Sequence, residues 1–283
     1  PSRPGGAHLR PARRAPVSTR RAPPSLALAP GLLGLLALVV GAPLAHAQRS
    51  TAIPADRFVP AVGPGAMLQA EGGQVAPRFQ LFGSLAFSYL SAPIVLRGSD
   101  GAAQSDPVRD RVGADLALEL GLGARLALGL GLPVVLWQGG DRLQGSGDPE
   151  TARPLATSAV GDIRLRGKAS LLRPGLPVTL GSVLELTVPA GGQEDFAASA
   201  GPTFAARLLF GARVRLLSIA LDAGVRFAPS RRLYQSAVGH RFEWAAALGL
   251  LPLPPRLRRP GLGVLAELAG AVDPLVGLPA DTA

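Results

Sequence analysis

The chain has 283 residues and no cysteine, which excludes disulfides, thiolate metal sites and a cysteine nucleophile. Its formal net charge is +10, but six of its 29 basic residues and none of its 19 acids precede Ala47. The remaining 23 bases and 19 acids give a net charge of only +4. With a single lysine, Lys168, and no basic patch rich in aromatic residues, this excess excludes nucleic acid as an expected partner.

Residues 1–47 have the order of a secretory signal peptide. Six arginines precede an apolar run, Leu26 to Val40, and the small-residue triplet Ala45-His46-Ala47 follows it as a cleavage signal. We expect cleavage after Ala47, with Ala45 and Ala47 as the recognised residues. The alternative is a membrane anchor, but the apolar core of about 15 residues is shorter than the ~20 that a spanning helix needs. The pair Arg20-Arg21 leaves a twin-arginine signal as a second alternative.

Behind this signal, apolar residues occupy every second position in nine stretches. In the clearest one, from Val112 to Leu122, the intervening positions are small or charged. Side chains of a strand alternate between its two faces, so the pattern predicts strands with one apolar face. The expected strands are 79–90, 111–122, 125–137, 159–171, 177–189, 202–212, 214–228, 236–250 and 261–271.

The connections between these strands alternate in length. Long polar stretches follow the odd-numbered strands, at 91–110, 138–158, 190–201 and 229–235, whereas short turns follow most even-numbered ones. Outer-membrane barrels have short periplasmic turns and long outer loops. The predicted fold is therefore all-β: an antiparallel up-and-down transmembrane β-barrel of about 9–12 strands.

Four segments follow from this assignment. They are the signal peptide 1–47, an irregular periplasmic lead-in 48–77 with at most a short strand near Met67 to Ala70, the barrel 78–272 and a tail 273–283. Bacterial barrels normally have an even number of strands. Either the lead-in supplies a tenth strand or the chain is a fragment that stops before the barrel closes, and we expect truncation.

Charged residues lie on the face opposite the apolar one. An arginine that faces lipid at the midplane costs about 2–4 kcal/mol, so these side chains are expected to face the lumen. Mixed signs on neighbouring strands predict ion pairs that either fill a narrow interior or line a solute path favouring anions. The expected lumen-facing network is Asp115, Glu119, Asp162, Arg164, Arg166, Lys168, Glu185, Arg207, Asp222, Arg226, Arg241 and Glu243.

The sequence predicts no catalytic, cofactor-binding or metal site. His240 is the one histidine after the signal, and it lies on the expected outward face beside Trp244. This position leaves no histidine in the lumen for a Ser-His pair or a zinc cluster. The glycines at Gly121 and Gly123 lack the third glycine of a dinucleotide-binding loop, and the 161–169 stretch lacks the spacing and hydroxyl of a phosphate-binding loop.

Four short motifs resemble the barrel region of OmpA-family outer-membrane proteins. They are Arg57-Phe58-Val59-Pro60, Leu122-Gly123-Ala124-Arg125-Leu126, Leu132-Pro133-Val134-Val135-Leu136 and Gly161-Asp162-Ile163-Arg164-Leu165. The last motif also resembles barrels grouped as transporters in aromatic-degradation pathways. The resemblance covers about residues 57–272.

The resemblance implies a protein of the Gram-negative outer membrane, with outer-membrane lipid and the barrel-assembly machinery as partners. Its implied role is structural, in the cell envelope, and the alternative is a passive porin-like solute or anion channel or transporter. Peptidoglycan would be a partner only through a domain that this sequence does not contain. A lipid-modifying enzyme and a soluble exported β-sandwich are the remaining hypotheses.

Overall fold

The computed structural model describes residues 54–56, 58–97, 103–141, 155–191, 195–199, 201–214, 216–229, 231–233, 236–250 and 264–272. The expected signal peptide 1–47, its residues Ala45 and Ala47, and the tail 273–283 lie outside the described residues. In the part of the chain that is described, no helix is long and apolar enough to cross a membrane.

Nine long strands form one antiparallel sheet in chain order, which confirms the all-β prediction. They are β1 (Leu81–Arg97), β2 (Ala103–Gly121), β3 (Leu126–Gly139), β5 (Ile163–Ser170), β6 (Val178–Val188), β7 (Thr203–Val214), β8 (Leu217–Phe227), β11 (Arg241–Leu250) and β12 (Val264–Val272). The short β4 (Ala159–Val160) pairs with β3. Two further short strands, β9 (Arg231–Leu233) and β10 (Ser236–Val238), form a separate hairpin.

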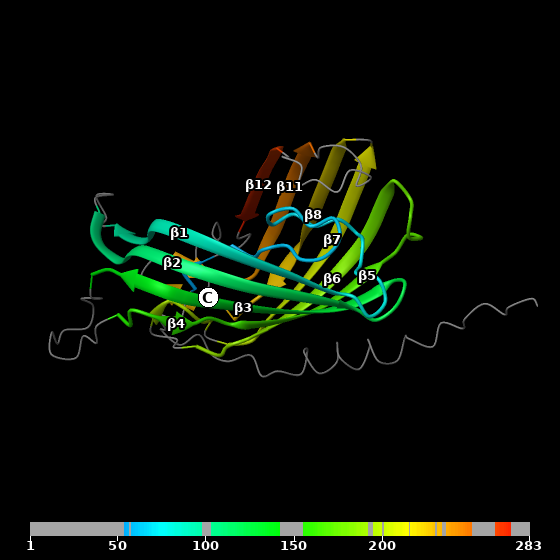
Figure 1. The fold of residues 1–283 in the computed structure, drawn as a ribbon. Coiled ribbons are helices and arrows are strands. Elements are labelled where there is room, and N and C mark those ends of the chain that lie inside the picture. Colours follow the sequence, from blue (N-terminus) through cyan, green and yellow to red (C-terminus); the bar gives the residue numbers. More distant parts are fainter. Residues whose placement is uncertain are drawn as a thin grey trace, which may run out of the picture. The chain divides into compact units, whose positions relative to one another are not determined.

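The large sheet curls into a half-barrel, with β1 to β3 facing β7, β8, β11 and β12 across its concave side (Figure 1). Each strand pairs with its neighbour in the chain, so the topology is a simple meander. Among the described residues, β1 pairs only with β2 and β12 only with β11. The half-barrel is therefore open between its first and last strands.

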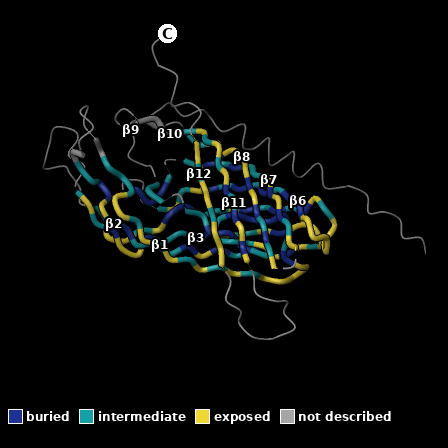
Figure 2. The backbone as a smooth tube through the Cα atoms, turned by 90° about the horizontal axis from the view of Figure 1, so that it is seen from above, coloured by how far each residue is buried: buried dark blue, intermediate teal, exposed yellow. Residues whose placement is uncertain are grey.

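Burial alternates along the strands, as Figure 2 shows by the alternation of exposed and buried residues along the tube. In β2, Leu116 and Leu120 are 41% and 39% exposed, whereas Asp115 and Glu119 are 2% and 3% exposed. The convex face of the sheet is thus apolar and its concave face is charged. Charged residues are almost never fully buried in proteins unless they are paired, so the charges of the concave face must find partners there.

Four details of the predicted segments differ from the structure. The expected 91–110 loop is mostly strand, because β1 continues to Arg97 and β2 begins at Ala103, with bulges near Ser91 and Ile94 that admit the polar residues and prolines. The expected strand 159–171 is broken at 161–162, between β4 and β5, and 236–250 divides into β10 and β11. Residues 67–70 form a turn between the bridged residues Ala66 and Glu71 instead of a strand.

Residues 58–80, which we call the inner segment, have no regular strand and lie on the concave side of the sheet. The preceding residue Ala55 donates its N–H to the carbonyl of Phe196, at the end where the longer connections lie. At the other end of the sheet, Phe79 donates its N–H to the carbonyl of Gly121, at the close of β2. The segment therefore runs the length of the concave face, a contact that its irregular sequence did not predict.

Candidate functional site

Charged side chains meet on the concave face, and ten of them make one connected network of ion pairs. Its acids are Glu71, Glu119, Glu185, Asp222 and Glu243, and its bases are Arg166, Lys168, Arg207, Arg226 and Arg241. Five acids and five bases give the network a formal charge of zero. Buried charges are tolerated when they are paired in this way, because an unpaired one would lose its hydration without compensation.

Glu71, on the inner segment, is the centre of this network and is only 1% exposed. Its carboxylate accepts a hydrogen bond from Arg166 and lies 3.4 Å from Lys168 Nζ and 3.9 Å from Arg207 Nη2. Three cations therefore surround one buried carboxylate, and opposite charges at these distances favour its ionised form.

A second set of contacts surrounds Glu185 of β6, whose side chain is fully buried. Its carboxylate oxygens lie 2.8 Å from Arg226 Nη2 and 3.5 Å from Arg166 Nε. Glu243 Oε1 accepts hydrogen bonds of 2.8 Å from Arg226 Nε and 2.6 Å from Arg241 Nε. Charges of alternating sign thus run from strand to strand across β5, β6, β8 and β11.

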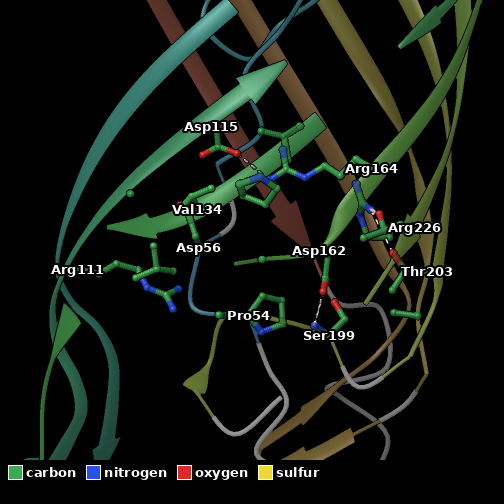
Figure 3. Close-up of a pocket in the computed structure, with 18 of the residues that line it drawn as sticks. Pro54, Asp56, Arg111, Asp115, Val134, Asp162, Arg164, Ser199, Thr203 and Arg226 are labelled. Atoms are coloured by element: carbon green, nitrogen blue, oxygen red, sulfur yellow. Dashed lines mark hydrogen bonds and ion pairs between the residues drawn. The ribbon is translucent and has the colours of Figure 1, made fainter. Parts of the chain in front are cut away.

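The remaining predicted residues lie beside this network (Figure 3). Arg164 Nη2 and Asp115 Oδ1 form a separate pair at 3.0 Å. Asp162 accepts hydrogen bonds of 3.1 and 2.9 Å from the backbone N–H of Ser199. The structure therefore brings eleven of the twelve predicted residues into ion pairs, and Asp162 instead fixes the connection that follows β6.

Sequence reasoning missed Glu71, Arg111 and Glu267, of which Glu267 of β12 accepts the N–H groups of Leu68, Gln69 and Ala70. Arg111 of β2 is 1% exposed and donates from Nε and Nη2 to Gln138 Oε1, at 3.0 and 2.7 Å. It also donates to the carbonyl of Phe196 at 2.9 Å, so the 195–199 segment is fixed over β2 and β3. Arg111 lies in the same alternation as Asp115, a signal that the sequence offered. Glu71 lies in an irregular segment and gave no such signal.

Two cavities lie between the sheet and the inner segment together with the residues just before it. The first, of about 110 Å³, is bounded by Asp56, Arg111, Asp115, Arg164 and Asp162, among others (Figure 3). This volume holds on the order of a few water molecules. The second, of about 480 Å³, lies among the inner segment, β1, β7, β8, β11 and β12, and its wall includes Arg207, Asp222, Arg226, Arg241 and Glu243. Both walls carry charges of both signs.

The chemistry that this arrangement supports is charge pairing. Among the described residues, no three His, Cys, Asp or Glu side chains come together as a metal site. His240 is exposed and makes other contacts: its Nδ1 accepts a 3.2 Å hydrogen bond from the N–H of Ala228, and its ring meets the ring of Phe227 edge-on.

No protein-family model, curated protein or solved structure matches this chain. The resemblance to OmpA-family barrels and to transporters of aromatic-degradation pathways therefore stays a prediction that depends on short motifs.

Proposed function

We propose that this protein is an outer-membrane β-barrel with a structural role in the envelope, like the barrels of the OmpA family. One observation carries the proposal: the apolar face of the sheet points outward and the ionic face points inward. On β3, for example, Leu128 and Leu130 are 54% and 41% exposed. A row of this kind on every long strand is costly in water and favourable against hydrocarbon.

Strand length and the predicted export signal support the same location. β6 and β8 have 11 residues each and β11 has 10, which matches the ~9–11 residues that a tilted transmembrane strand needs. A signal peptide with cleavage after Ala47 would deliver the chain across the inner membrane. In hydrocarbon, backbone N–H and C=O groups without a hydrogen-bond partner are costly. The proposal therefore requires that the outer edges of β1 and β12 pair with each other or with parts of the chain outside the described residues.

The charge balance favours a structural role over open passage. A selective pore presents an excess of one sign to the permeating ion. Here the network has five acids and five bases, and the inner segment lies along the concave face between its opposite walls. An interior of this kind holds the strands together through paired charges.

The alternative is a passive anion channel, and the specific observation in its favour is the set of arginines near the smaller cavity. Arg111, Arg164, Arg226 and Arg241 all contribute to its wall. Anions that enter from the end with the long connections would meet these guanidinium groups first. The two functions differ in conductance, since only the channel passes ions in its resting state.

Reconstitution followed by electrical recording tests the proposal. The full chain, refolded in detergent, should float with phospholipid vesicles and resist extraction by alkaline carbonate, and it should be silent in planar bilayers. Steady anion-selective steps that Arg164→Glu and Arg166→Glu abolish would instead establish the channel. A protein that purifies and stays monomeric without detergent would overturn the membrane location altogether.

A further inference from the structure

We infer that the inner segment, residues 58–80, is a removable plug, and that the barrel becomes an anion-preferring channel when this segment leaves the concave face. The inference rests on the proposed membrane location. It adds an activity that a purely structural barrel lacks, and it names the residues that keep the pathway closed.

The inner segment crosses the concave face and contacts strands near both ends of the sheet order. Glu267 of β12 accepts hydrogen bonds from three successive N–H groups of the segment, those of Leu68, Gln69 and Ala70, at 3.0, 2.6 and 3.0 Å. On the opposite side, Glu119 of β2 accepts the N–H of Ala76 at 2.9 Å. One continuous segment therefore bridges the second and the last strands of the half-barrel.

Between these two attachments the segment fits tightly against the middle of the sheet. Gly73 packs directly on β6: a Cβ atom at this position would lie 2.3 Å from the carbonyl carbon of Leu180. Gly72 approaches β7, where its Cα lies 3.1 Å from the Cβ position of Gly211. A side chain at Gly73 or Gly211 would not fit between these backbones, so the segment excludes solute from the centre of the concave face.

The forces that hold the segment are mainly polar, which makes its release feasible. The hydrophobic residues of the segment that are buried are small: Ala61, Val62, Ala70 and Ala76. The strong contacts are the carboxylates of the wall that accept its N–H groups and the ion pairs of Glu71. Neutralising one partner of a buried ion pair removes that attachment, so substitution can release the segment. Its apolar contact with the sheet is Met67, which packs against the buried cluster of Ala70, Ala220, Ala245 and Ala247.

Departure of the segment also leaves the ion-pair network with one more base than acids. Glu71 leaves with it, so the network keeps four acids, Glu119, Glu185, Asp222 and Glu243, against five bases. Arg166, Lys168 and Arg207 lose their common partner and become binding groups for a permeating anion. The opened barrel should therefore prefer chloride to potassium.

A release variant and a reversible lock test this inference. Glu71→Gln together with Glu267→Gln weakens the central and terminal attachments without changing side-chain size. The locked variant is the release variant with Gly72→Cys and Thr179→Cys added, so that a disulfide can tie the segment to β6. A Cβ at Gly72 would lie 3.6 Å from Thr179 Oγ1, with no atom nearer. The chain has no cysteine of its own. Thr179→Cys alone in the release background is the control that cannot form the bridge.

All four proteins, including the wild type, are first tested for flotation with vesicles and then recorded in planar bilayers. We expect a silent wild type, a conducting release variant with a reversal potential toward that of chloride, loss of conductance in the oxidised locked variant, and its return on reduction with dithiothreitol. The Thr179→Cys control should conduct in both redox states.

The possible failures are distinguishable. If the wild type does not enter vesicles, the proposed function fails. If the wild type floats but already conducts like the release variant, or if the release variant folds and floats but is silent, the plug inference is overturned. A locked variant that conducts in both its oxidised and its reduced state overturns the plug inference equally. A release variant that prefers potassium overturns the predicted selectivity.

Discussion

The carboxylate of Glu71 accepts a hydrogen bond from the guanidinium of Arg166, although 95 residues separate them in the sequence. Glu71 belongs to an irregular segment and Arg166 to β5, so this contact joins the inner segment to the wall of the half-barrel. Both side chains are buried. A charge-assisted contact in such surroundings is strong only while both partners are present.

Neutralising Glu71 should therefore destabilise the protein strongly. Glu71→Gln leaves Arg166, Lys168 and Arg207 without their common partner, and loss of one partner of a buried pair costs about 3–5 kcal/mol. The measurement is urea-induced unfolding of the vesicle-bound protein.

The matched control for this variant is an exposed ion pair. Asp141 and Arg109 form a pair whose side chains are 44% and 59% exposed. Asp141→Asn should cost at most about 1 kcal/mol, because solvent screens exposed pairs. Equal losses for Glu71→Gln and Asp141→Asn would show that the central network does not hold the fold.

Gly73→Ala should release the inner segment through steric clash with β6. The added Cβ would lie 2.3 Å from the carbonyl carbon of Leu180, and overpacking of this kind costs about 1–3 kcal/mol. Gly167→Ala in β5 is the control, because nothing lies within 4 Å of its Cβ position. Limited proteolysis should cut the inner segment faster in Gly73→Ala only, and equal rates in both variants would contradict the docking described here.

Arg164 and Asp115 should show a pairwise coupling energy that is independent of the inner segment. A double-mutant cycle with Arg164→Ala and Asp115→Ala should give a coupling of about 0.5–3 kcal/mol, as expected for residues in contact. The same cycle in the Glu71→Gln background should give the same coupling, since no ion pair of the described residues links this pair to the network. A coupling that disappears in that background would show that the pair depends on the segment.

On the outer face, an arginine substitution should destabilise the protein more strongly the deeper it would lie in the bilayer. Leu130 lies in the middle of β3 and Leu176 in the connection before β6; they are 41% and 48% exposed. Leu130→Arg should cost about 2–4 kcal/mol and Leu176→Arg about 0–1 kcal/mol when unfolding is measured from vesicles. In water both substitutions would fall within about 0.5 kcal/mol of zero, so equal small effects would contradict a membrane location.

The strands could be predicted because the occurrence of apolar residues at every second position is a local property of the sequence. Val112 to Leu122 predicted both the strand and the face that each side chain takes, and β2 has this arrangement. The missed extension of β1 and β2 has a physical reason: Pro93 and Pro107 indicate a loop in a sequence, but bulges near Ser91 and Ile94 allow the hairpin to continue past them.

The position of Glu71 could not be predicted, because it depends on a contact between segments distant in sequence. Residues 58–80 have no period, and their glycines and prolines indicate only irregular structure. What fixes them is the match between Gly72-Gly73 and the backbone of β6 and β7, together with charges supplied by several strands. Asp162 illustrates the same limit: alternation gave its face, but its partner is the backbone of Ser199.

The central claim is that two environments alternate along each strand, and spin labelling tests it most directly. Because the chain has no cysteine, single labels can be placed at Leu116, Ala117 and Leu118 in β2 and at Leu208 and Leu209 in β7 of the vesicle-bound protein. We predict high collision rates with lipid-dissolved oxygen at Leu116, Leu118 and Leu208, and low rates at Ala117 and Leu209. Rates without alternation, or higher access of a water-soluble nickel complex to the three outward positions, would contradict the account.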